Sequence, residues 1–333
     1  MKVPEASVHR LIPVAALVLT LLADVRPAAA AQRPPVAPSS EATADSSMLR
    51  ELAARRRAEI DKTIAARDWS RAETLLVAEI ERTQKPVDLL KMLAGVFMNE
   101  HKPLNAAIAI KKAETYGPLD ANTRLQLVLA YISMRRSDWA RPELERLVAA
   151  DPLNTGYAYW LARLDYDSGR YAAAIDRLQT VVQREPSFMR AYDNLGLCYE
   201  ALNQPDEAVR QYREAIRRTR EAGEKWPWPF LNLGILLKNS GQIEEAEALF
   251  NEALQADPAF APALYHLGTI LEGSDRTEKA VQALLRAAAA DPSYAEPHFA
   301  LSRIYRRQGR IAEADAALAT FQQLHQPARE VRR

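Results

Sequence analysis

The chain has little glycine, one cysteine and few aromatic residues, and each shortage excludes a class of protein. Glycine supplies 11 of 333 residues, roughly half the usual share, which disfavours dinucleotide-binding and P-loop folds with their glycine-rich turns. A single cysteine, Cys198, excludes an intramolecular disulfide, and no Cys and His residues have the spacing of a zinc site. An aromatic content of 7% disfavours a β-sandwich. The sequence therefore predicts a helical protein.

The chain also lacks an excess of one charge and a hydrophobic run long enough to span a membrane. Its formal net charge is +1, so nothing indicates a nucleic-acid partner. The apolar run Leu11–Ala23 is shorter than the roughly 20 residues of a membrane span. It follows Lys2 and Arg10 and precedes the small residues 28–31, the order of a secretory signal peptide. We expect residues 1–31 to be a cleaved signal peptide and the protein to be periplasmic or secreted; an uncleaved anchor is the alternative.

Proline and glycine recur at a fixed spacing through the rest of the chain. Pro118, Pro152 and Pro186 lie 34 residues apart, as do Pro258 and Pro292. The gaps from Pro186 to Pro258 and from Gly169 to Gly241 are both 72 residues, two periods plus four. The spacings of proline and of glycine thus both indicate a single insertion of four residues in the same part of the chain. An array over 47–328 is predicted, with repeats near residues 53, 87, 121, 155, 189, 227, 261 and 295. It is flanked by a flexible linker at 32–46 and a C-terminal tail at 329–333.

Within each 34-residue period, apolar residues recur at the spacing of an α-helix in two separate stretches. In the second stretch one place is always alanine: Ala72, Ala106, Ala140, Ala174, Ala208, Ala246, Ala280 and Ala314. One turn later the residue is large: Leu76, Ile110, Leu144, Leu178, Tyr212, Phe250, Leu284 and Leu318. Small residues opposite large ones let two helices approach closely and interlock. We therefore expect Gly196, Gly234 and Gly268, in the first stretch, to lie where helices touch, and Gly169, Gly241 and Gly309 to mark turns.

These features resemble the tetratricopeptide repeat family. Residues 189–220 and 227–258 carry its pattern most fully, with Leu195-Gly196 and Leu233-Gly234 in the first helix and the alanines in the second. The resemblance implies an all-α fold, a right-handed α-solenoid of about eight helix pairs whose first helices line a groove that binds proteins or peptides. The first repeat, with polar residues at apolar places, suits a solvated N-terminal cap.

The register predicts which side chains face the groove. They are Tyr159, Trp160, Arg163, Tyr166, Arg190, Asn194, Trp228, Asn232, Lys238, Tyr265, His266, Arg303 and Arg306. Aromatic rings with arginine and amide groups suit peptide recognition. Packing between repeats is the alternative for Tyr159 and Tyr265. Asp193 stands where the family's carboxylate-binding clamp would have a lysine or a neutral residue, which disfavours a free C-terminal carboxylate as ligand.

Two further features have alternative interpretations. The insertion at 217–229 contains Trp226 and Trp228, either as a gripping element at the groove or as cover for a seam between repeats. Two basic clusters near the C-terminus are either an anion-binding surface for phospholipid or an acidic partner, or solvated caps. The first consists of Arg303, Arg306, Arg307 and Arg310, and the second of Arg329, Arg332 and Arg333.

No catalytic pattern occurs in the sequence: no nucleophile elbow, phosphate loop, metal motif or carboxylate pair. Cys198 is predicted to be a buried, inert thiol. We expect no enzyme activity, no cofactor and no metal. The leading hypothesis is an exported scaffold that binds a protein or peptide partner. The alternatives are a component of an envelope assembly or secretion machine for pili or polysaccharide, and an accessory subunit of an enzyme.

Overall fold

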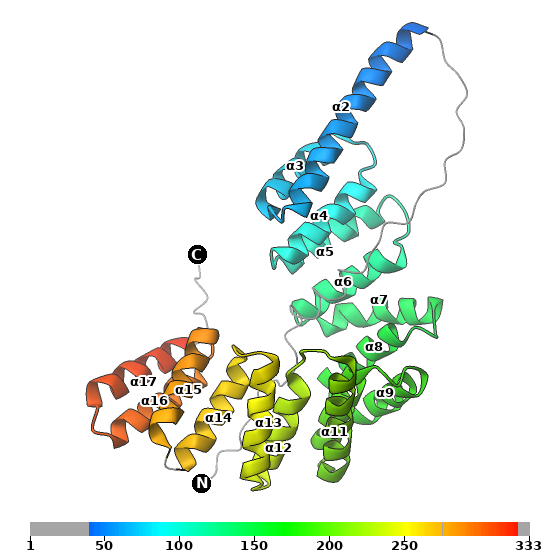
Figure 1. The fold of residues 1–333 in the computed structure, drawn as a ribbon. Helices are drawn as coiled ribbons and strands as arrows, with labels where there is room; N and C mark the ends of the chain where they lie inside the picture. The colour runs from blue at the N-terminus through cyan, green and yellow to red at the C-terminus, as the bar shows by residue number, and fades with distance from the viewer. Residues whose placement is uncertain (1–39, 275, 326–333) are drawn as a thin grey trace. The chain divides into compact units, whose positions relative to one another are not determined.

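The computed structural model describes residues 40–274 and 276–325, and all regular structure in these ranges is helical (Figure 1). The helices are α2 (Ser40–Ala65), α3 (Trp69–Arg82), α4 (Val87–Asn99), α5 (Pro103–Glu114), α6 (Ala121–Ser133), α7 (Ser137–Ala150), α8 (Thr155–Asp167), α9 (Tyr171–Arg184), α10 (Met189–Ala201), α11 (Pro205–Ala222), α12 (Trp228–Asn239), α13 (Ile243–Ala256), α14 (Ala261–Gly273), α15 (Thr277–Ala290), α16 (Glu296–Arg307) and α17 (Ile311–His325). Their order confirms the all-α prediction.

The helices reproduce the predicted repeat period. The first helices of successive pairs begin at residues 87, 121, 155, 189, 228, 261 and 296, each within one residue of the predicted start. At the N-terminal end, α2 begins at Ser40 and includes residues 40–46, which the sequence placed in a linker. No proline or glycine occurs between Pro38 and Pro86, so neither residue stops α2 from extending back to Ser40. The expected signal peptide, 1–31, and tail, 329–333, lie outside the described residues.

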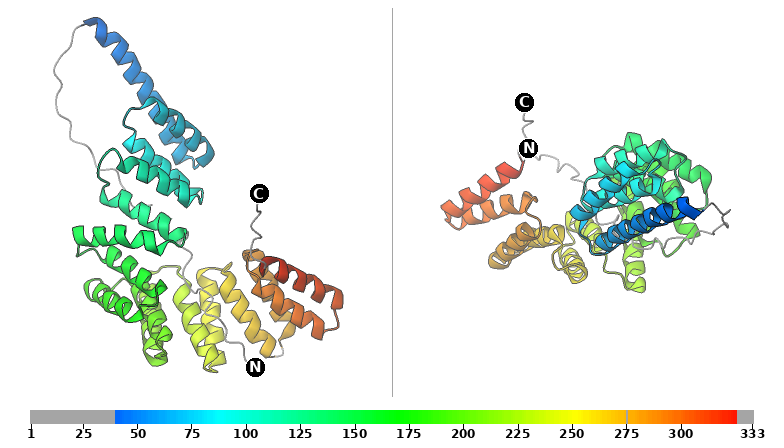
Figure 2. Two further views of the ribbon diagram at one scale, coloured as in Figure 1. Left: turned by 180° about the vertical axis from the view of Figure 1, so that it is seen from behind. Right: turned by 90° about the horizontal axis from the view of Figure 1, so that it is seen from above.

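The described helices form two compact units, α2–α8 and α9–α17, divided between Asp167 and Ser168. In each unit, helices that follow one another along the chain pack together, as α4 does with α5 and α14 with α15 (Figure 2). First helices of neighbouring pairs also touch: α4 contacts α6, and α10, α12, α14 and α16 form a contacting series. The first helices of a unit therefore share one face.

The eight equivalent alanines form the centre of the packing. Ala72, Ala106, Ala140, Ala174, Ala208, Ala246, Ala280 and Ala314 all have 0% of their surface exposed. The large residues one turn later, from Leu76 to Leu284, are at most 1% exposed. Leu318, in the last described helix, is half-buried. The predicted pairing of small and large residues is confirmed.

The glycines of the first helices lie directly against these large side chains. A Cβ atom added at Gly196 would lie 2.4 Å from Cε1 of Tyr212. At Gly234 it would lie 2.6 Å from Cε1 of Phe250, and at Gly268 it would lie 2.8 Å from Cγ of Leu284. Real Cβ atoms do not approach other heavy atoms this closely, so only glycine lets each ring or leucine insert.

Turns between the two helices of a pair use the left-handed backbone conformation. Gly169, Gly241 and Gly309 have φ of 72°, 84° and 74°, which confirms their predicted place in turns. Four residues with a side chain occupy equivalent turns, with φ of 56–58°: Arg67, His101, Arg135 and Asn203. For a residue with a Cβ this conformation costs about 1–2 kcal/mol.

Replacing Arg135 by glycine is expected to stabilise the protein slightly. Relief of the left-handed strain, about 1–2 kcal/mol, is partly offset by the greater entropy of glycine in the unfolded chain, about 0.5–1 kcal/mol. The net gain is about 0.5 kcal/mol, measured as a rise in Tm by circular dichroism. Arg135→Ala keeps the Cβ and is the control. An equal gain in both variants would show that the exposed arginine side chain, and not the backbone, is responsible.

The insertion lengthens α11. This helix has 18 residues, whereas α9 and α13 have 14 each, and the difference is about one turn. It ends at Ala222, and Gly223 caps it with a φ of 65°. Trp226 and Trp228 follow and are only 7% and 9% exposed. The insertion is therefore built into the packing, which favours the seam interpretation of the two tryptophans over a gripping element.

Candidate functional site

The shared face of the first helices in the second unit carries a row of polar side chains. We call it the polar row and define it as Arg190, Asp193, Asn194, Asn232, Lys238, Tyr265, His266, Glu272 and Arg303, from α10, α12, α14 and α16. Side chains of adjacent first helices meet at three places along it. Each of these contacts joins one repeat to the next.

The first contact lies between α10 and α12. Nδ2 of Asn232 donates a hydrogen bond of 2.9 Å to Oδ1 of Asp193, and the two residues are 0% and 1% exposed. The carboxylate only accepts, which settles the orientation of the Asn232 amide. Its Oδ1 is buried and accepts no hydrogen bond from the described residues. Beside this pair, Nδ2 of Asn194 donates to the carbonyl of Arg190 at 2.7 Å.

The second contact lies between α12 and α14. Nζ of Lys238 is 3.2 Å from Nδ1 of His266. An ammonium group only donates, so Nδ1 is the acceptor and the proton of the neutral imidazole is on Nε2. The imidazole is stacked on Phe250, with 5.5 Å between ring centroids, and meets Tyr265 edge-on at 5.0 Å. Packing thus holds His266 in place, with an acceptor aimed at Lys238.

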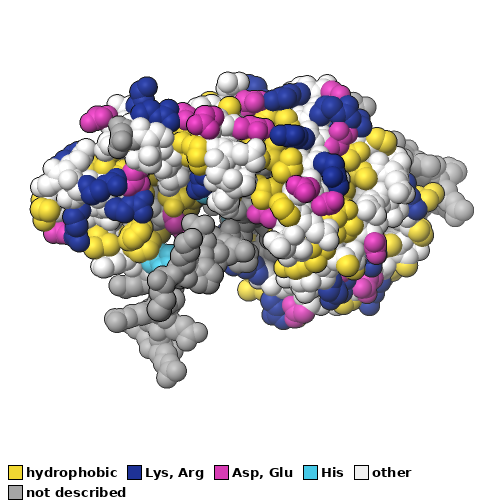
Figure 3. Space-filling model, turned by 90° about the horizontal axis from the view of Figure 1, so that it is seen from below, with side chains coloured by type: hydrophobic (Ala, Val, Ile, Leu, Met, Phe, Trp, Pro, Cys, Tyr) yellow, Lys and Arg dark blue, Asp and Glu magenta, His cyan; other side chains and the backbone are white. Residues whose placement is uncertain are grey.

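The third contact lies between α14 and α16. The carboxylate of Glu272, whose side chain is 6% exposed, receives the guanidinium groups of both Arg303 and Arg307. Arg306 is paired with Asp315 at 2.7 Å, and Arg310 is paired with Glu313. Every arginine of the first predicted basic cluster is therefore paired with a carboxylate, and the second cluster, Arg329, Arg332 and Arg333, lies outside the described residues. On the face in Figure 3, basic and acidic side chains lie beside one another in the same way. The solvated-cap interpretation is favoured.

The predicted groove residues divide into a buried and an accessible group. Buried to 9% exposure or less are Tyr159, Trp160, Arg163, Asn194, Trp228 and Asn232. At least partly exposed are Tyr166, Arg190, Lys238, Tyr265, His266, Arg303 and Arg306. A side chain with so little exposed surface offers little to a partner, so we retain the second group as candidates for direct contact.

The buried aromatic residues have clear packing partners. Tyr159 meets Trp160 edge-on at 5.7 Å in α8, and the guanidinium of Arg163 lies 5.9 Å from the Trp160 ring. Trp228 meets Phe260 edge-on at 5.0 Å. The packing alternative for Tyr159 is thus favoured. Trp226, which the register did not place in the groove, lies 5.5 Å from the guanidinium of Arg190, and only the structure reveals this contact.

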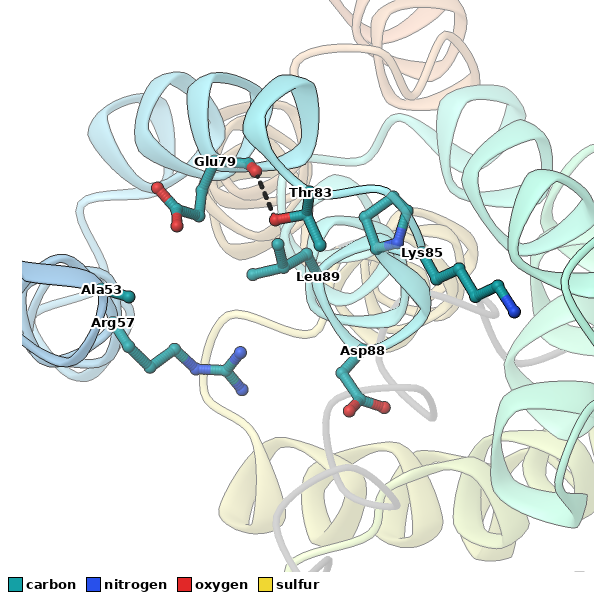
Figure 4. Close-up of a pocket in the computed structure, with 8 residues that line it drawn as sticks. Ala53, Arg57, Glu79, Thr83, Lys85, Asp88 and Leu89 are labelled. Carbon is teal, nitrogen blue, oxygen red and sulfur yellow. Dashed lines mark hydrogen bonds between the residues drawn. The ribbon is translucent and has the colours of Figure 1, made fainter. Parts of the chain in front are cut away.

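A pocket of about 270 Å³ lies in the first unit, where α2 faces the connection between α3 and α4 (Figure 4). Leu89 and Pro86 provide its apolar lining, and Arg57 reaches into it from α2. Two of its polar groups have partners within the protein: Oγ1 of Thr83 donates to the carbonyl of Glu79 at 2.8 Å, and the Glu79 carboxylate accepts from Nε of Arg56 at 2.6 Å. None of the predicted groove residues lines this pocket.

The described ranges, 40–274 and 276–325, contain no group of His, Cys, Asp and Glu residues arranged to hold a metal ion. No helix in them is both long and apolar enough to cross a membrane. Cys198 is completely buried, as predicted. His298 is half-buried, and this partial burial lowers the pKa of its imidazole.

The sequence matches no curated protein, but the fold is similar to that of several solved structures. Among solved structures, yeast Tom70 is 17% identical with a TM-score of 0.62, covering 78% of this chain and 55% of its own. A tetratricopeptide repeat protein from Parabacteroides merdae is 16% identical with a TM-score of 0.54, covering 73% and 94%. PilW, a type IV pilus biogenesis factor, is 20% identical with a TM-score of 0.53, covering 61% and 92%.

Family models point to the same conclusion. Four models described as tetratricopeptide repeat match residues 134–219, 187–259, 231–295 and 295–320. Together they cover residues 134–320, a continuous stretch of more than half of the chain. The chain is a member of the tetratricopeptide repeat family.

Proposed function

We propose that this protein is a non-enzymatic scaffold that binds an extended segment of a protein partner along the polar row of its second unit. The observation that carries the proposal is the continuity of that row. Asp193 with Asn232, Lys238 with His266, and Glu272 with Arg303 link four successive first helices by polar contacts. A ligand lying across the helices would meet one accessible polar side chain on each of them: Arg190, Lys238, His266 and Arg303.

The chemistry of the accessible side chains favours a peptide. Tyr265 and His266 are held rigid by ring contacts with Tyr294 and Phe250, so they offer contact area at little entropic cost. The charged groups of the row that a partner can reach, Arg190, Lys238 and Arg303, are all basic, whereas Asp193 and the side chain of Glu272 are only 1% and 6% exposed. The row therefore suits a polar segment that includes acidic side chains.

Site-specific photo-crosslinking in the native host tests the proposal. A photoreactive amino acid replaces Tyr265, and the control replaces Leu285, which is 48% exposed on the second helix α15 of the same unit. We expect one protein to be captured from position 265 only. The double variant Lys238→Ala, Arg303→Ala should reduce the yield of the crosslinked protein at least about tenfold. This corresponds to a loss of about 1.4 kcal/mol of binding free energy. Equal capture at both positions would contradict the proposal. Enzymatic turnover of a substrate by the purified protein would also contradict it, if the His266→Ala substitution abolished that turnover.

We also propose that the protein acts outside the cytoplasm, because the order of basic, apolar and small residues at 1–31 is that of a secretory signal. A role in an envelope assembly is the more specific version of this proposal. Mass spectrometry of the protein purified from its host is expected to find a new N-terminus near residue 32. An intact Met1 on the protein in the cytoplasmic fraction would contradict it.

A further inference from the structure

Arg163 on α8 is a charged side chain that the fold buries without a partner. It is only 5% exposed, and its Nε is buried and makes no hydrogen bond. No carboxylate of the described residues pairs with it. Its guanidinium lies 5.9 Å from the ring of Trp160, which is the outer limit of a cation–π contact and satisfies no N–H group. Burying an ionised group in this way is strongly unfavourable.

The other arginines of the first unit show what Arg163 lacks. Each half-buried arginine in the described part of this unit has a carboxylate partner: Arg56 pairs with Glu79, Arg124 with Glu143, Arg136 with Asp138 and Arg141 with Asp165. Arg163 is buried more deeply than these four, so it has the greater need of an acceptor. The described residues do not supply one.

The repeat register explains the missing acceptor. Arg163 and Arg303 stand at the same place, eight residues after the repeat starts at 155 and 295. Nε and Nη2 of Arg303 donate to the carboxylate of Glu272 on the preceding first helix, at 3.1 and 2.5 Å. Glu272 stands eleven residues after the start at 261, and eleven residues after the start at 121 is Ile132. Isoleucine accepts no hydrogen bond, so the place that satisfies Arg303 leaves Arg163 unsatisfied.

Arg163 needs little exposed surface to bind an anion. Of its three guanidinium nitrogens, Nε alone is buried without a partner, so the edge formed by Nη1 and Nη2 keeps its access to solvent. A carboxylate binds this edge with two parallel hydrogen bonds. The surrounding protein strengthens the attraction, because opposite charges interact more strongly in a medium of low dielectric constant. The uncharged groove residues that are equally buried have no such source of binding free energy.

We propose that Arg163 binds the carboxylate of an acidic side chain on a polypeptide partner. One guanidinium neutralises one carboxylate, whereas a phosphate dianion would keep an excess negative charge at a buried place. The other cation at α8, Arg141, is already bound to Asp165 at 2.8 Å. Tyr166 lies one turn further along the same face of α8 and is half-buried. Its ring gives the partner chain a contact beside the bound carboxylate.

Isothermal titration calorimetry with a blocked peptide of six glutamates tests the binding role. Every chain compared carries Lys238→Ala and Arg303→Ala, so the result does not depend on the polar row, which lies in the other unit. We expect saturable binding that Arg163→Met weakens at least about tenfold, and no binding of a peptide of six glutamines. Equal binding with and without Arg163→Met would overturn the proposal. Binding of glutarate or inorganic phosphate as tight as that of the peptide would also overturn it, because the ligand would then be a small anion.

Thermal unfolding without ligand separates a binding residue from a structural one. Arg163→Met removes an unpaired buried charge and is expected to raise Tm, measured by circular dichroism. Arg141→Met is the matched control: it takes the cation from Asp165, which is 2% exposed, and should lower Tm. A fall in Tm for Arg163→Met as large as that of the control would overturn the proposal, since Arg163 would then be bound within the protein.

Discussion

Replacing Gly196 by alanine should destabilise the protein, although alanine is the better helix former. The new Cβ would lie 2.4 Å from Cε1 of Tyr212, so the ring or a helix must move. Tyr212 has no exposed surface, and its hydroxyl donates to Oε2 of Glu200 at 3.0 Å. Overpacking of this kind costs about 1–3 kcal/mol, and the gain in helix propensity, about 1 kcal/mol, offsets only part of it.

The control for this experiment is the same substitution in an open position. Gly95 lies within α4, and a Cβ added there meets no atom within 4 Å. Gly95→Ala is therefore expected to raise Tm, because it gains helix propensity without strain. Urea denaturation followed by circular dichroism gives both free energies of unfolding. Opposite signs for the two variants are expected; a stabilised Gly196→Ala would show that the ring moves freely and that the close contact is not needed.

Replacing Ala208 by leucine should have the second large effect. Ala208 is completely buried in α11, one turn before Tyr212, and the place is alanine in all eight repeats. Three additional carbon atoms have no space between the helices of the pair, so the free energy of unfolding should fall by about 1–3 kcal/mol.

Ala222→Leu is its matched control. Ala222 is exposed at the end of the same helix, so leucine there should change Tm by little. Differential scanning calorimetry of both variants separates overpacking from the general effect of a larger side chain on α11. An unchanged Tm in Ala208→Leu would mean that the alanine register is wrong.

Most of the fold could be predicted from the sequence because many helix boundaries carry a proline or a glycine at a fixed spacing. Proline follows the end of several second helices, as at Pro152, Pro258 and Pro292, glycine adopts the left-handed turn at Gly169, Gly241 and Gly309, and alanine in each second helix is small enough for the close contact between helices. The 34-residue period of these residues located first-helix starts to within one residue. The start of α2 was the exception, because prolines and serines at 32–39 indicated a linker and nothing marked where it ended.

The candidate site was less predictable, since the register shows which side a residue faces but not what covers it. Trp228 and Tyr265 were both predicted to line the groove, yet Trp228 is 9% exposed against Phe260 while Tyr265 keeps accessible surface. The lengthened α11 explains the difference, because the insertion displaces the tryptophans into the packing between repeats. No signal in the sequence indicated which ring would be buried.

The repeat period, the alanine and glycine positions at which helices touch, and the single insertion could all be predicted from the amino-acid sequence. These follow from backbone conformation and side-chain size, which are properties of one residue. The tertiary structure decided the contacts between repeats: Asp193 with Asn232, Lys238 with His266, and the pairing of Glu272 with Arg303 and Arg307. Partners in these contacts are 28 to 39 residues apart. Hydrogen bonds and ion pairs depend on distance in space, and stacked helices alone bring such residues together.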